Sequence, residues 1–119
     1  MKVSEIKAEN IANYLRITEV DKSLKEDLST FLEIAINYVE NYTGIQRKKE
    51  DANQLESLDD YNDLIIVIYI LCQDMYDNRS MYIDKNYKND TVKTILDMHT
   101  RNNLWQMLVN IIKKYEFLQ

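Results

Sequence analysis

Few side chains of this sequence could carry out chemistry. His99 is the single histidine and Cys72 the single cysteine, and Cys72 lies in the most apolar stretch, where a cysteine behaves as a small hydrophobic residue. Asp74 and Asp77 are three residues apart, as on one helix face, but the pattern supplies no third metal ligand. Catalysis needs a nucleophile with a base, paired carboxylates in a pocket, or a metal cluster. We therefore predict no enzymatic activity, no metal site and no cofactor.

The absence of known catalytic and cofactor-binding motifs and the net charge also argue against an enzyme or a nucleic-acid binder. The sequence has no Walker A motif, no dinucleotide-binding fingerprint, no zinc-ligand spacing and no HExxH motif. The net charge is −5, and residues 1–63 carry 14 acidic against 8 basic side chains, whereas residues 64–119 carry 6 against 7. Affinity for nucleic acid depends on neutralising phosphates, so an acidic chain is not an obvious nucleic-acid binder. Arg47-Lys48-Lys49 is followed at once by Glu50 and Asp51, which favours a solvated loop over a phosphate site.

The elements that position these residues are predicted to be helices. The chain has no proline and one glycine, too few turn residues for most β-rich folds. Apolar side chains at spacings of three and four predict a short helix over 8–15 and a long one over 22–42. Gly44 follows the long helix, and we expect it to adopt a left-handed conformation in a Schellman motif, with Ile45 folding back onto the last turn.

A central helix is predicted at about 60–77, because residues 64–72 are apolar on every side. Asp59, Asp60 and Asp63 suit its N-terminus, where the helix dipole favours negative charge. A strand over 64–71 is the alternative, since isoleucine and valine favour strands. Polar loops are expected at 46–60 and 78–90. Two further helices are expected at about 90–99, with an inner face of Val92, Ile95, Leu96 and His99, and at about 104–118.

The predicted fold is all-α: a compact bundle of about four to five helices around the central helix. Residues 1–104 would form the domain and residues 105–119 a C-terminal helical extension. The apolar run of the central helix is too short to span a membrane, and the N-terminus has no apolar signal-peptide core. We expect a protein that stays in the cell that makes it, or in an assembly built there.

Three stretches taken together resemble a known family. They are VSEIKAENIANYLRI at 3–17, AINYVENYTG at 35–44, and QDMYDNR at 73–79 followed by Asp84-Lys85 and TILDMH at 94–99. The order and spacing of the second and third stretches carry most of the specificity. The chain is similar over about residues 1–104 to the head–tail connector proteins of tailed phages and prophages, also called head-completion, adaptor or DNA-packaging proteins. The motif residues are Tyr42, Thr43, Gly44, Asp74, Met75, Tyr76, Asp77, Asn78 and Arg79.

The resemblance implies a non-enzymatic, α-helical protomer located in the virion neck and made in the bacterial cytoplasm. It implies a homo-oligomeric ring, expected to hold twelve copies, that binds the portal protein, extends the DNA channel and docks a stopper or tail-completion protein. DNA would pass without sequence-specific binding. The sequence differs from the family at Asp97, where members commonly have glycine, and in continuing beyond Leu104, where many members stop.

The extension is the predicted portal or subunit interface. Its anchors would be Trp105, Leu108, Ile111, Ile112 and Tyr115, because tyrosine and tryptophan are favoured at interfaces. For Asp74–Arg79 two interpretations stay open: a helix C-terminus in which Arg79 pairs with nearby acids, or part of the ring surface. The alternative function is a small helical regulator that binds nucleic acid or another protein.

Overall fold

The computed structural model describes residues 1–101, 108 and 111–115 of the chain, and the regular elements of residues 1–101 are all helical. The α-helices are α1 (Ala8–Tyr14), α2 (Lys22–Thr43), α3 (Leu64–Asn78) and α4 (Asp90–His99). Two 3₁₀ turns, η1 (Val3–Glu5) and η2 (Leu58–Asp60), precede α1 and α3. The predicted all-α class is confirmed. The alternative of a strand over 64–71 is wrong, because these residues begin α3.

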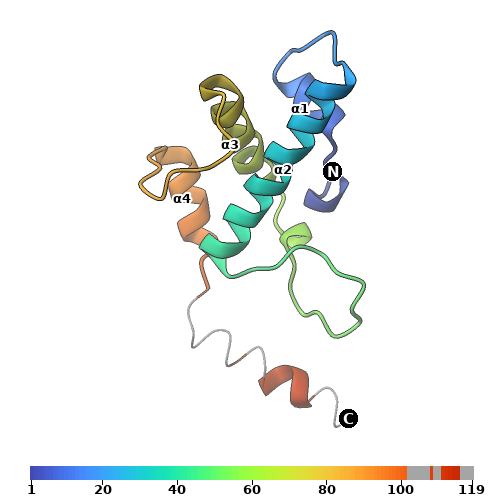
Figure 1. The fold of residues 1–119 in the computed structure, drawn as a ribbon. Helices are drawn as coiled ribbons and strands as arrows, with labels where there is room; N and C mark the ends of the chain where they lie inside the picture. The colour runs from blue at the N-terminus through green and yellow to red at the C-terminus, as the bar shows by residue number, and fades with distance from the viewer. Residues whose placement is uncertain (102–107, 109–110, 116–119) are drawn as a thin grey trace.

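α2 and α3 form the centre of the bundle. α3 runs back beside α2 in the opposite direction, and both helices contact α1 and α4 as well as each other (Figure 1). The core takes apolar side chains from all four helices and from both 3₁₀ turns. Its fully or almost fully buried members include Val3, Ile11, Leu28, Val39, Leu58, Val67, Ile68, Leu71 and Leu96. The central position predicted for the 60–77 helix is confirmed.

α3 is nevertheless not packed on every side, as its sequence suggested. Ile66 and Tyr76 are 40% and 36% exposed, and Ile65, Tyr69 and Ile70 are only partly buried. The reason is geometric: α1, α2 and α4 cover part of the circumference of α3 and leave one side open. An apolar sequence on all faces therefore marks the central helix here without guaranteeing its complete burial.

The start of α3 differs from the prediction. Asp59 accepts hydrogen bonds from the backbone N–H and the hydroxyl of Ser4 (2.8 and 2.6 Å), which joins η2 to η1. Asp60 accepts from the backbone N–H of Ser57 at 3.0 Å. Asp63 contacts His99 on α4 rather than its own helix. Asp59 and Asp60 therefore belong to a separate 3₁₀ turn, and α3 begins only at Leu64.

Gly44 has the predicted left-handed conformation, with φ of 79°. Its N–H donates to the carbonyl of Glu40 at 2.9 Å, which is the single bond of an αL motif. The predicted Schellman pattern is wrong at this end, because the N–H of Ile45 donates to the hydroxyl of Thr43 at 3.1 Å instead. Ile45 itself is buried, as expected of a residue that folds back onto the helix.

Schellman patterns occur instead at two arginines. After α3, Arg79 (φ 51°) and Ser80 donate their N–H groups to the carbonyls of Tyr76 and Met75, at 3.3 and 3.0 Å. Arg16, two residues after the end of α1, has the same arrangement, with φ of 60°. Left-handed backbone costs about 1–2 kcal/mol for a residue with a Cβ. The backbone hydrogen bonds of the two turns therefore form despite this cost.

The segment between α2 and α3 is attached to the bundle. The guanidinium of Arg47 forms ion pairs with Glu33 and Glu40 of α2, each at 2.8 Å, and donates to the side chain of Asn37. Leu58 is fully buried and its N–H donates to the carbonyl of Gln46 at 2.9 Å. Of the basic cluster, Arg47 is thus bound to α2, and only its two lysine neighbours are exposed.

Candidate docking surfaces

The predicted interface helix is described at residues 108 and 111–115, which are helical. Leu108, Ile111, Ile112 and Tyr115 have the sequence spacing i, i+3, i+4 and i+7, which would place them on one face of a continuous helix. They are 46%, 46%, 49% and 66% exposed. We call these four residues the C-terminal stripe. Trp105, the fifth predicted anchor, lies outside the described residues.

Arg101 holds the chain where it leaves α4. Its backbone N–H donates to the carbonyl of Thr43 at 2.6 Å, at the end of α2. Its guanidinium contacts Glu56 at 2.8 Å, the hydroxyl of Tyr61 at 2.9 Å and the carbonyl of His99 at 3.0 Å. Arg101 and Glu56 are each only 17% exposed, so this ion pair is less screened than a surface pair. The chain beyond α4 therefore starts from a fixed point on the bundle.

The first group of motif residues closes the end of α2. Thr43 is fully buried, and its hydroxyl donates to the carbonyl of Val39 at 2.7 Å. The hydroxyl of Tyr42 donates to the carboxylate of Asp97 on α4 at 2.5 Å. This hydrogen bond, with a smaller contribution from burial, raises the pKa of Tyr42 to about 12. Asp97, where the related family commonly has glycine, thus binds α4 to a motif residue of α2.

The second group forms the end of α3. Met75 is buried, whereas Tyr76, Asp77, Asn78 and Arg79 are exposed. Tyr76, Asp77 and Arg79 line a hollow of about 370 Å³, whose other residues are Leu24, Asp27, Phe31 and Met81. Arg79 forms no ion pair among the described residues, so the interpretation in which it pairs with nearby acids is wrong. The turn itself is held by backbone hydrogen bonds, and the Arg79 side chain is exposed.

Three tyrosines connect the two motif groups. Tyr87 donates its hydroxyl to the carboxylate of Asp74 on α3. Its ring lies 6.3 Å from that of Tyr38, which lies 6.0 Å from that of Tyr42. Burial, followed by the hydrogen bond to Asp74, raises the pKa of Tyr87, and burial raises that of Tyr38. The two motif groups therefore belong to one connected polar and aromatic surface, although their helix ends are far apart along the bundle (Figure 1).

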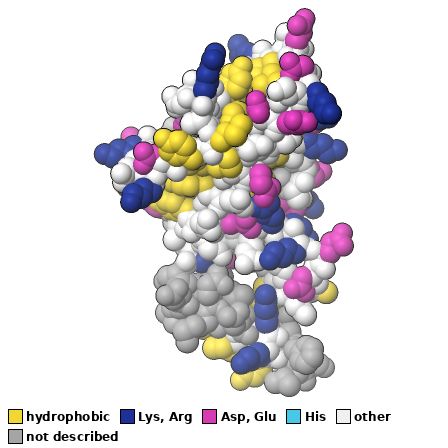
Figure 2. All heavy atoms as spheres, viewed as in Figure 1, with side chains coloured by type: hydrophobic (Ala, Val, Ile, Leu, Met, Phe, Trp, Pro, Cys, Tyr) yellow, Lys and Arg dark blue, Asp and Glu magenta, His cyan; other side chains and the backbone are white. Residues whose placement is uncertain are grey.

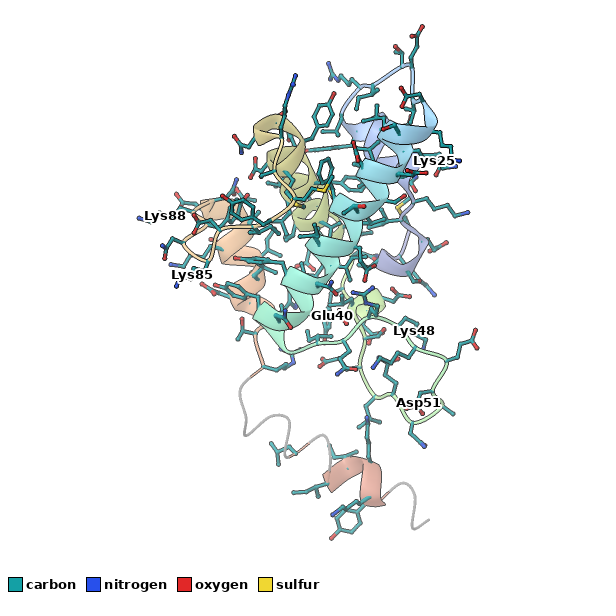
Figure 3. All side chains as sticks on the ribbon, viewed as in Figure 1. Lys25, Glu40, Lys48, Asp51, Lys85 and Lys88 are labelled. Carbon is teal, nitrogen blue, oxygen red and sulfur yellow. The ribbon has the colours of Figure 1, made fainter. Side chains whose placement is uncertain are left out.

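A cleft of about 560 Å³ opens beside these tyrosines, between α2, α4 and the segment before α4. We call it the tyrosine cleft. Its lining residues are Tyr38, Tyr42, Lys85, Asn86, Tyr87, Lys88, Asn89, Asp90, Val92, Lys93 and Leu96. Lys85 and Lys88 extend outward from this side of the molecule (Figure 3). The sequence analysis missed this site. The feature of the sequence that could have indicated it is the presence of three lysines within 85–93 around one tyrosine.

The side chains first considered for catalysis do not meet. Cys72 is fully buried in α3, and burial raises the pKa of its thiol to about 12. His99 contacts the carboxylate of Asp63 through Nε2 at 2.7 Å, and its ring packs against Tyr61 with 4.5 Å between ring centroids. Within the described part of the chain, no group of three or more histidine, cysteine or acidic residues could hold a metal ion.

Comparison with protein-family models, with curated proteins and with solved structures gave no match to this chain. Among the described helices, none combines the length and the apolar character needed to cross a membrane.

Proposed function

We propose that the protein is a structural head–tail connector of a tailed phage or prophage. Its copies form a ring, expected to be dodecameric, below the portal in the virion neck. The ring extends the DNA channel and docks a stopper or tail-completion protein. The all-helical bundle agrees with what the resemblance implies, and the net charge of −5 suits a conduit that does not retain DNA.

The C-terminal stripe is the observation that carries this proposal. Its four aliphatic and aromatic side chains are all exposed, although the chain is rich in charged residues. Anchors at i, i+3, i+4 and i+7 are typical of a helix that binds in a groove of a protein partner. In this proposal the partner is the portal protein.

The fixed start of the extension supports the same assignment. Arg101, four residues before the extension, holds the chain against the ends of α2 and α4. A segment tethered to an ordered point of the domain loses less conformational freedom on binding than a free peptide, so less of the interaction free energy is spent on ordering.

The test is native mass spectrometry of the full chain mixed with the portal protein of the same phage or prophage. The wild-type protein should form a closed ring on the portal. Leu108→Asp/Ile112→Asp should weaken portal binding at least about 100-fold, because two interface anchors are lost. Both positions are half exposed in the protomer, so folding should be preserved.

Met98→Asp is the matched control, since Met98 is an exposed apolar residue on a helix outside the stripe. It should leave portal binding unchanged. A stripe variant that binds portal as well as the wild type would remove the stripe from the proposal. A wild-type protein that stays monomeric or dimeric and ignores the portal would overturn the proposal as a whole.

A second candidate, a small helical regulator that binds nucleic acid, is favoured only by the lysines of the tyrosine cleft. Aromatic side chains beside basic ones can stack bases and neutralise phosphates. This candidate requires DNA affinity that falls steeply with salt, and a filter-binding titration at low salt measures it.

A further inference from the structure

The tyrosine cleft combines an apolar floor with a basic rim. The floor is taken from lining residues that are buried or half-buried, Tyr38, Tyr42 and Val92, and the rim from exposed ones, Lys85, Lys88 and Lys93. None of the three lysines has an ion-pair partner among the described residues. Asp90 is the single carboxylate residue of the lining. The cleft is therefore suited to a group that presents an apolar side chain next to carboxylates.

This chain carries such a group on its other side. The connection between α1 and α2 exposes Val20 between Glu19 and Asp21, and Glu26 follows one turn into α2. We call these four residues the acidic edge. Glu19 and Glu26 have no ion-pair partner in the described part of the chain. Lys25 is paired with Glu9 at 2.9 Å, so the edge stays negative even with Lys22 beside it.

The cleft and the edge lie on opposite sides of the bundle. In Figure 1 the α1–α2 connection is at the upper right, and the segment leading into α4 is at the left. In Figure 2 acidic side chains lie at the upper right and basic side chains at the left margin, each with some side chains of the opposite charge beside them. One copy cannot bring its own edge into its own cleft, but two copies can be joined head to tail through these surfaces.

We propose that the acidic edge of one copy docks into the tyrosine cleft of the next copy. Val20 contacts the tyrosine floor, and Glu19, Asp21 and Glu26 face the lysine rim. Such a contact uses two different patches on each subunit, so it is heterologous and can be repeated from copy to copy until a ring closes. The inference rests on the proposed function only in taking the closed product to be the connector ring.

A second copy explains the cleft better than nucleic acid does. The rim has three lysines against one aspartate, and the whole chain is acidic, so phosphate neutralisation is weak. Charge complementarity between the acidic edge and the tyrosine cleft sets the register of their contact. It disfavours contacts of edge with edge or cleft with cleft, in which like charges meet.

The test is a charge-swap series in the full chain, followed by sedimentation velocity at low salt and high protein concentration. Lys85→Glu/Lys88→Glu should weaken self-association about 100-fold, because like charges then face each other, and so should Glu19→Lys/Glu26→Lys. An equimolar mixture of the two variants should associate again, since each reversed surface then finds an opposite one. Both variants alter exposed side chains, and circular dichroism checks their folding.

Lys48→Glu/Lys49→Glu is the matched control, with the same charge change on two exposed lysines outside the cleft and the edge. It should associate like the wild type. The inference is overturned if the wild type does not self-associate, if the cleft variant associates normally, if the mixture fails to restore association, or if the cleft lysines prove necessary for DNA binding instead.

Portal binding is measured separately, through the C-terminal stripe. Self-association through the cleft without portal binding would retain the docking contact and overturn the connector function. Portal binding by a wild type that never self-associates through the cleft would overturn the docking contact and retain the connector function.

Discussion

α2 and α3 end in the same left-handed backbone conformation but in opposite surroundings. At the end of α2, a glycine, Gly44, occupies the left-handed position, so no Cβ is strained there. Thr43 and Ile45 on either side of it are buried, and the N–H of Arg101 donates to the last carbonyl of the helix. At the end of α3, an arginine takes the strained position, and Met81 beyond it is half exposed. The first end is sealed into the domain, whereas the second opens onto solvent.

The difference indicates that the α2 end contributes mainly to the stability of the domain, whereas the α3 end is free to contact other molecules. At the α2 end the hydroxyls of Tyr42 and Thr43 and the N–H groups of Gly44 and Ile45 all have partners within the chain, so we expect substitutions there to act on stability. The α3 end holds its shape with backbone hydrogen bonds and leaves Tyr76, Asp77 and Arg79 around an open hollow. We expect substitutions there to change stability little, or even to increase it.

The largest effect should come from Thr43→Val, which keeps the shape and removes the hydroxyl. The buried N–H of Ile45 then loses its acceptor, which should lower the free energy of unfolding by about 2 kcal/mol. Urea denaturation measures this. Thr30→Val is the control, because the Thr30 hydroxyl bonds only to Glu26 on an exposed face, and its effect should stay within about 0.5 kcal/mol.

Gly44→Ala should lower the free energy of unfolding by about 1 kcal/mol, because alanine at φ of 79° places a Cβ against the backbone. Gly44→Asn should cost less, since asparagine tolerates this region better. Thermal unfolding of both variants checks the ranking. Equal losses for alanine and asparagine would show that the glycine is needed for space rather than for its backbone conformation.

Arg79→Gly should raise the free energy of unfolding by about 0.5 kcal/mol: relief of left-handed strain exceeds the added entropy of the unfolded chain. Arg79→Lys keeps both the Cβ and the charge and should change nothing. Denaturation midpoints decide between them. Destabilisation by glycine would mean that the arginine side chain contributes to the domain after all.

An effect of similar size is pH-dependent and concerns Tyr42. Its pKa is raised from 10 to about 12, so the stability from its bond to Asp97 is fully present below pH 10 and is lost as the pH rises through about 12. Tyr42→Phe should be about 0.5 kcal/mol less stable than the wild type below pH 10, and this difference should disappear by pH 12. A difference that persists at pH 12 would argue against the hydrogen bond as its source.

The sequence was most informative where a pattern is local. The bounds expected for α2 and α4 agree with the structure to within one residue, because their apolar spacing is unbroken and Asp21 and Asn89 cap their N-termini. The left-handed conformation of Gly44 was predicted from an equally local pattern, the single glycine after the long helix. All of these depend on contacts within a few residues of each other.

Long-range partners account for what was missed. Arg101 reaches Glu56, 45 positions away, and Asp59 reaches Ser4, 55 positions away, so no local spacing reveals them. The Schellman patterns at Arg16 and Arg79 escape prediction because arginine gives no signal for left-handed backbone. The tyrosine cleft needs Tyr38 and Tyr42 from α2 beside lysines that come more than forty residues later.

The burial of Cys72 has a practical consequence. The thiolate is the reactive form of cysteine, and this thiol is enclosed in α3 as the only one in the sequence. Subunits in any assembly are therefore held by non-covalent contacts, because no disulfide can form between folded copies. A thiol reagent added to the unmodified protein would react only when the bundle opens, so its labelling rate would report opening without any engineered probe.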